Sequence, residues 1–179
     1  MLRQVPLPFS VSAITLGSFL FDRNRRLQMA LLSPDGTIHV MAPSGFDSLA
    51  WTADDMKMLQ QVRLGKTASP FHPLANNQDE SWQEIETFRG VAPFSGSSRV
   101  PTLVRSRPGG SGGDDLTVFN HDADQTIVVS HGYTQHGVAG FAAGQTQAQS
   151  GSARSVVGAV AMRLNAASPS GVLAIRQGK

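Results

Sequence analysis

Residues 27–41 read LQMALLSPDGTIHVM, and this stretch decides the fold. Apolar residues fill both of its ends, and a turn sequence separates them. Pro34 fixes the φ angle that an early turn position requires, and Gly36 supplies the positive φ of a later one. Ile38 and Val40 are β-branched and suit a pleated surface. The stretch therefore predicts a β-hairpin.

The hairpin belongs to a longer unit that recurs along the chain. Residues 13–19, AITLGSF, predict another strand ahead of it, so the unit runs strand, polar loop, strand, turn, strand. The same order of parts returns twice. The second copy has strands at 102–106, 115–119 and 126–129, and the third has strands at 156–162 and 172–176. Because the third copy is cut short, we expect a truncated last repeat.

The first and second copies are separated by a surplus of about thirty residues, and repeat proteins place such insertions in loops on one face. Within the surplus, residues 52–55 (TADD) resemble a capping box, and residues 56–62 have apolar side chains at helical spacing. Residues 82–88 predict the outer strand of the first unit. We therefore divide the chain into a first repeat at 11–99 with an insertion at about 47–80, a second at 100–151 and the start of a third at 152–179.

Short motifs stand at matching places in the three units. They are GSF at 17–19, QMAL at 28–31, DLTV at 115–118 and GVLA at 171–174. With these motifs the units resemble the FG-GAP/VCBS repeats of integrin-α-like β-propellers. The resemblance implies an all-β fold, a partial β-propeller-type array of antiparallel strands with a loop and short-helix insertion.

The same resemblance implies a function and a location. It implies a non-enzymatic binding or scaffold segment whose ligand is a protein or a polymer, at the cell surface or outside the cell as part of a longer secreted protein. Propellers close by repetition of typically at least four blades, so this chain leaves sheet edges exposed. We expect further blades of a longer chain, or association of copies through those edges.

The family's calcium loops are incomplete in this chain. Calcium takes six to eight oxygen ligands, which one or two acids cannot supply. In the first loop Asp22 and Asn24 stand among arginines, and Gln28 replaces the closing acid. The other loops retain few oxygen ligands: Asp114 and Asp115 in the second, Asn165 and Ser168 in the third, with Gly171 at the closing position. We therefore assign no metal ligand, no cofactor and no catalytic residue.

A different class of function is a stand-alone β-rich enzyme or metal-binding protein. It would use the loop residues His121, His131 and His136 with Asp122 or Asp124. The spacing of the last two histidines is not the i, i+4 pair that places two imidazoles on one helix face, so surface histidines are favoured. A second alternative is a carbohydrate-binding module. Its stacking platforms would be Trp51, Trp82 and Tyr133, although aromatic residues this sparse belong more often to a core.

Composition narrows the partners further. The chain has 15 Lys and Arg against 13 Asp and Glu, a net charge of +2 that predicts no nucleic-acid partner. It contains no cysteine, which excludes disulfides and thiolate chemistry. Gln4, Pro6 and Pro8 interrupt the apolar N-terminus, so we expect no signal peptide in this chain. No apolar run reaches the roughly 18 to 20 residues of a membrane helix, so we expect no membrane partner.

Overall fold

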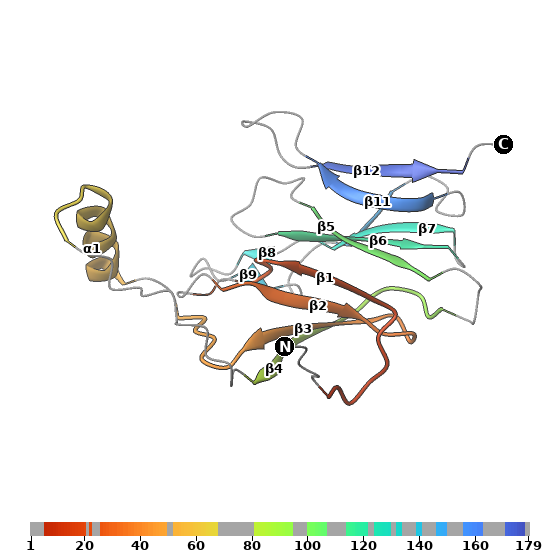
Figure 1. Cartoon of the computed structure of the whole chain (residues 1–179), viewed down its shortest axis with the longest axis horizontal. Helices are drawn as coiled ribbons and strands as arrows, with labels where there is room; N and C mark the ends of the chain where they lie inside the picture. Colours follow the sequence, from red (N-terminus) through yellow and green to blue (C-terminus); the bar gives the residue numbers. More distant parts are fainter. Residues whose placement is uncertain are drawn as a thin grey trace, which may run out of the picture.

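The computed structural model describes residues 6–20, 22, 26–49, 52–67, 81–94, 100–106, 114–121, 124–129, 132–133, 139–140, 146–149, 156–162 and 171–177. Within these ranges the chain forms antiparallel β-sheets and one α-helix (Figure 1). The expected all-β class is therefore confirmed at this level.

The first sheet is a four-stranded antiparallel meander. Its strands, in spatial order, are β1 (Ala13–Gly17), β2 (Gln28–Leu32), β3 (Thr37–Pro43) and β4 (Trp82–Arg89). The predicted hairpin is the β2–β3 pair, in which Leu32 lies opposite Ile38. Its turn closes with a hydrogen bond from Gly36 N to Ser33 O at 3.0 Å, and Gly36 has a φ of +82°.

The second sheet repeats the same order of strands. Its strands are β5 (Thr102–Ser106), β6 (Asp115–Asn120), β7 (Gln125–Val129) and β10 (Thr146–Gln149), paired in that order and antiparallel. Between β7 and β10 the short strands β8 (Gly132–Tyr133) and β9 (Ala139–Gly140) pair with each other. The sequence TQAQ of β10 lacks an apolar face, and we did not predict that strand.

The last described strands form a separate antiparallel pair. β11 (Val156–Met162) and β12 (Gly171–Arg176) lie where the third repeat unit was expected to have its strands. A shift of register between Val156 and Gly158 interrupts the pairing near the start of β11.

The first sheet, the second sheet and the β11–β12 pair are stacked in that order (Figure 1). β5 contacts β1 on one side and β11 on the other, so the first strands of the three layers follow one another. The core between the two sheets contains Phe19, Leu20, Ala30, Leu32, Ile38, Val40, Val91, Leu103, Leu116, Val118, Ile127 and Val129. The core between the second sheet and the β11–β12 pair contains Val104, Phe119 and Val156.

The second sheet is covered on both faces because its strands carry apolar side chains on both faces. Along β6, Leu116 and Val118 face the first sheet, whereas Phe119 belongs to the core beneath β11 and β12. Every residue of β6 is buried. Burial of each large aliphatic side chain contributes about 1.5–3 kcal/mol, so packing on both faces fixes this sheet in the middle of the stack.

The insertion carries the predicted helix, α1 (Ala53–Arg63), which projects away from the sheets (Figure 1). The helix ends in a Schellman motif, with bonds from Gly65 N to Val62 O at 3.0 Å and from Lys66 N to Gln61 O at 2.9 Å. Gly65 adopts the left-handed conformation that this motif requires, with a φ of +70°. The stretch 52–67 therefore forms a helix that projects from the β-sheets and caps its own C-terminal end.

Candidate functional site

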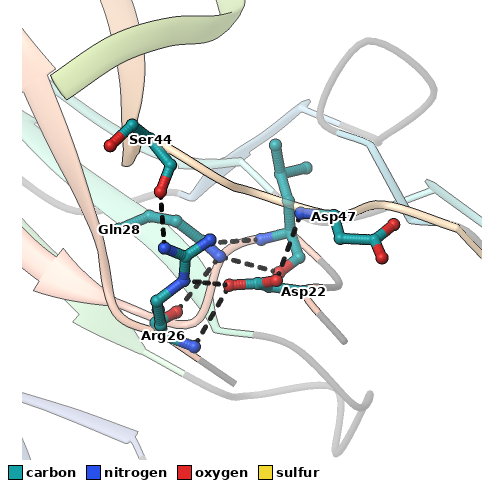
Figure 2. A network of polar contacts seen from close by, with 6 residues as sticks. Asp22, Arg26, Gln28, Ser44 and Asp47 are labelled. Carbon is teal, nitrogen blue, oxygen red and sulfur yellow. Dashed lines mark hydrogen bonds and ion pairs between the residues drawn. The ribbon is translucent and has the colours of Figure 1, made fainter. Parts of the chain in front are cut away.

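The loop between β1 and β2 is the first of the three loops in which the sequence lacks a complete set of calcium ligands, and it contains a buried polar network (Figure 2). The loop begins in the core, where Phe19 and Leu20 are buried. Asp22 and Gln28 are buried as well, at 5% and 0% exposure. Polar groups at such depth need internal partners, and the network supplies them.

Gln28 takes the place of the expected closing acid and uses its amide on the loop backbone. Its Oε1 accepts hydrogen bonds from Phe19 N and Leu20 N, both at 2.8 Å. Its Nε2 donates to Leu20 O at 3.0 Å and to Arg26 O at 3.3 Å. The amide has both acceptor and donor capacity, which a carboxylate lacks, so a glutamine can satisfy groups of both kinds in this loop.

Asp22 faces an arginine. Arg26 Nε lies 3.2 Å from Asp22 Oδ2, and Arg26 N donates to the same oxygen at 3.2 Å. Asp22 Oδ1 accepts a hydrogen bond from Asp47 N at 3.3 Å. The guanidinium continues to Ser44, donating from Nη1 to the carbonyl oxygen at 2.7 Å. Arg26 thus supplies a positive charge to a buried carboxylate and bridges it to the backbone that follows β3.

The network also fixes the position at which the insertion leaves the first sheet. Ser44 and Asp47 belong to the segment that leaves β3 and leads to α1. Ser44 N also donates to Ser81 O at 2.7 Å, at the point where the chain returns to β4. The exit and the return of the insertion are therefore held together, and the Asp22–Arg26 pair fixes the exit to the β1–β2 loop.

The second of these three loops, which leads into β6, links the first two sheets. Asp114 N donates to Ser18 O at 2.8 Å, and Ser18 N donates to Asp114 Oδ2 at 2.8 Å. This reciprocal pair joins the end of β1 to the start of β6 across 96 positions of sequence. Asp115, the other acid of the loop, is buried within β6. Asp114 therefore acts as a connector between the first two layers.

The remaining candidates of the sequence are only partly described. His121 is buried just after β6, and Asp124 lies in the β6–β7 turn with a φ of +51°. Trp82 is half-buried at the start of β4, and the backbone of Tyr133 lies in β8. Outside the described residues lie Asn24, Trp51, Asp122, His131, His136, Asn165 and Ser168. Among the described residues, no group of three or more His, Asp or Glu side chains is arranged to hold a metal ion.

One cluster of aromatic and polar side chains was missed by sequence reasoning. The ring of Phe9 stacks on that of His39, with centroids 3.7 Å apart and planes inclined by 10°. His39 Nδ1 lies 2.5 Å from Glu84 Oε2 on the neighbouring strand β4. His39 and Glu84 are 45 positions apart in sequence, and the alternation of acids within 82–88 was the available signal. The cluster holds the segment before β1 against the first sheet.

Comparison of the chain with protein-family models, with curated proteins and with solved structures finds no match. In the part of the chain that the structure describes, no helix is both long and apolar enough to span a membrane.

Proposed function

We infer that the chain is a non-enzymatic binding or scaffold segment of the FG-GAP/VCBS-like repeat type, with a protein or polymer as its ligand. The observation that supports this most is the stacking of β1, β5 and β11. Each is the first strand of its layer, and in the two complete sheets the later strands follow outward in chain order. Radially repeated sheets of this build are the blades of a propeller.

The polar loops support a scaffold role more than a chemical one. The buried Asp22 and the partly buried Asp114 are engaged with backbone donors or with an arginine, and they connect elements of the fold. Their oxygens hold elements of the fold together, whereas a catalytic carboxylate would face a substrate. We place the segment outside the cell or at the cell surface, as part of a longer secreted protein, on the strength of the family resemblance alone.

Two measurements on the purified chain test this proposal. Retention on immobilised collagen and on insoluble cellulose, compared with bare matrix, reports binding to a protein or to a polymer. We expect retention on one of these matrices and none on the bare support. Chromogenic ester, phosphodiester and glycoside substrates report catalysis, and we expect no turnover above buffer. Turnover that His121→Ala abolishes would overturn the proposal in favour of a histidine-based enzyme.

A further inference from the structure

The turn between β2 and β3 contains an aspartate followed by a glycine, Asp35–Gly36, and the main chain can rearrange at this bond. It is the one Asp-Gly bond in the sequence, and the sequence contains no Asn-Gly bond. The nitrogen of the residue that follows an aspartate lies within reach of the aspartate's own carboxyl carbon. Glycine has no Cβ atom to hinder that approach, so this bond is the most reactive of its kind in the chain.

The rearrangement needs no partner other than water. Gly36 N attacks Asp35 Cγ, a C–N bond forms, and the carboxyl hydroxyl leaves as water with the amide proton, which closes a five-membered succinimide. Water then adds to either ring carbonyl and breaks its bond to nitrogen. Addition at the original main-chain carbonyl gives isoaspartate, in which the main chain runs through Cβ and is one carbon atom longer. One water is released and one is consumed, and nothing is oxidised or reduced.

The folded turn opposes each requirement of the first step. Gly36 N is engaged as a donor to Ser33 O at 3.0 Å. The carboxylate is held on the residue after the glycine, because Oδ1 accepts from Thr37 N and Oδ2 from Thr37 Oγ1, each at 3.0 Å. The Ser33 hydroxyl, which contacts Oδ1, and the two bonds from Thr37 lower the pKa of Asp35 from 3.8 to about 2. The group therefore stays a carboxylate, which is a much poorer electrophile than the neutral acid. Asp35 itself is exposed, so these bonds protect it and burial does not.

The turn is also held against the rest of the molecule. Gly36 is buried, and a Cβ atom there would lie 2.1 Å from the backbone oxygen of Val91. Phe94 N donates to Pro34 O at 2.8 Å. Rotation of the Asp35–Gly36 peptide toward the carboxyl group therefore requires the turn to separate from residues 91–94. Local openings of this kind cost less free energy than global unfolding and occur in native proteins.

We propose that Asp35–Gly36 is a modification site at which isoaspartate forms when the β2–β3 turn opens, and that the docked turn protects it. The product cannot rebuild this protection. The additional main-chain carbon changes the spacing between Gly36 N and Ser33 O, and the free carboxylate is then attached directly to Cα, too short to span to Thr37. The close approach to Val91 leaves no room for a longer turn. The reaction belongs to the scaffold itself and is independent of the ligand of the proposed function.

Peptide mapping of the full chain measures the reaction at this bond. The chain is incubated in mildly acidic buffer with and without denaturing urea and cleaved with trypsin, and electron-transfer dissociation distinguishes isoaspartate from aspartate at Asp35. We expect isoaspartate to accumulate there in urea. In buffer it should form at least about tenfold more slowly, because the lowered pKa alone reduces the fraction of neutral acid by more than that factor. Equal rates in buffer and in urea overturn the proposal, as does an absence of isoaspartate at this position in urea.

Thr37→Val tests the protection within the folded chain. It removes the bond from Oγ1 to the carboxylate and preserves the β-branched shape in the strand. In buffer we expect isoaspartate to form several-fold faster than in the unmodified chain. Thr87→Val, at an exposed position of β4, is the matched control and should have the rate of the unmodified chain. An unchanged rate in folded Thr37→Val overturns the protective role of the turn. Far-ultraviolet circular dichroism checks each fold, and Ser33→Ala replaces Thr37→Val if that variant unfolds.

The modified chain tests the consequence for the fold. The isoaspartate form is separated by reversed-phase chromatography after incubation in urea and is returned to buffer. Its thermal unfolding should begin at a lower temperature than that of unmodified chain taken through the same steps. Identical unfolding of the two forms would show that the longer turn still docks, and this overturns the assigned consequence.

Discussion

Arg26 Nε lies 3.2 Å from Asp22 Oδ2, and the two side chains are 13% and 2% exposed. The pair closes the loop between β1 and β2. A guanidinium is a permanent cation with several donors in a plane, so it can balance a buried carboxylate and at the same time reach a second element. Here the second element is the backbone at Ser44.

Replacement of Arg26 by alanine should destabilise the fold strongly. Asp22 would remain buried without the guanidinium, and removing one partner of a buried ion pair costs about 3–5 kcal/mol. We expect a loss of about 3 kcal/mol in the free energy of unfolding, because Asp22 keeps its bond from Asp47 N. Urea unfolding followed by tryptophan fluorescence measures this change.

The chain offers an exposed ion pair as a control. Lys57 Nζ lies 3.4 Å from Asp54 Oδ1 on α1, with the side chains 75% and 91% exposed. Pairs of this kind contribute about 0–1 kcal/mol, so Lys57→Ala should change the unfolding free energy by less than about 1 kcal/mol. Equal effects of Arg26→Ala and Lys57→Ala would contradict the stabilising role of the buried pair.

Gln28→Leu should also lower stability, through lost hydrogen bonds at nearly constant volume. The substitution removes both acceptor bonds from the backbone of Phe19 and Leu20 and both donor bonds from Nε2. Each unsatisfied buried group costs about 1–3 kcal/mol, and we expect a total of at least about 3 kcal/mol. Thermal unfolding by circular dichroism reports the effect, and Gln83→Leu at an exposed position of β4 is the control. A loss no larger than that of the control would refute the assigned role.

The lowered pKa of Asp35 predicts that the free energy of unfolding depends on pH in the acid range. Its pKa is lowered from 3.8 to about 2, first by the hydroxyl of Ser33 and then by bonds from Thr37 N and Thr37 Oγ1. The folded state therefore favours the ionised form. Its contribution to stability is complete above the unfolded pKa of 3.8 and is lost as the pH falls toward about 2.

Asp35→Asn isolates that contribution. The variant lacks the titrating group, so its unfolding free energy should fall less steeply than that of the unmodified chain between pH 4 and pH 2. Urea unfolding at several pH values across this window gives both slopes. Parallel curves for Asp35→Asn and the unmodified chain would show that the turn does not stabilise the carboxylate.

Local sequence signals were sufficient for most strands and for the helix. The turn at 33–36 and the alternation in 115–119 act over a few residues, which is the range in which turn chemistry and periodicity operate. β10 was missed because TQAQ has neither apolar alternation nor β-branched residues beyond Thr146, and its pairing with β7 is a tertiary effect. The repeat organisation remains a prediction.

The polar contacts could not be read from the sequence for a related reason. The Ser18–Asp114 pair joins residues 96 positions apart, and the His39–Glu84 pair joins residues 45 positions apart. Nothing local distinguishes Asp114 as a connector from an acid in a calcium-like loop. The Asp22–Arg26 pair is closer in sequence, but its meaning depends on burial, which follows from the packing of Phe19 and Leu20 into the core.

Gly36 and Gly65 provide a test of how the β2–β3 turn docks on the rest of the molecule. Both have a positive φ, at +82° and +70°. A Cβ atom at Gly36 would lie 2.1 Å from the backbone oxygen of Val91, whereas at Gly65 no atom lies within 4 Å. Phe94 N donates to Pro34 O at 2.8 Å, so the backbone near Val91 is held against the turn and cannot easily retreat.

Alanine at both positions separates the two costs. Gly65→Ala should lower the free energy of unfolding only by the conformational cost of the left-handed region, about 1–2 kcal/mol. Gly36→Ala should be destabilised by that same cost. In addition, its Cβ atom would disrupt the close contact between the turn and the segment that leads to the second sheet. We expect its unfolding free energy to fall by at least about 2 kcal/mol more than that of Gly65→Ala, because overpacking by itself costs about 1–3 kcal/mol. If urea unfolding gives equal losses for the two variants, the turn is not pressed against Val91, and the close approach of the two backbones does not contribute to stability.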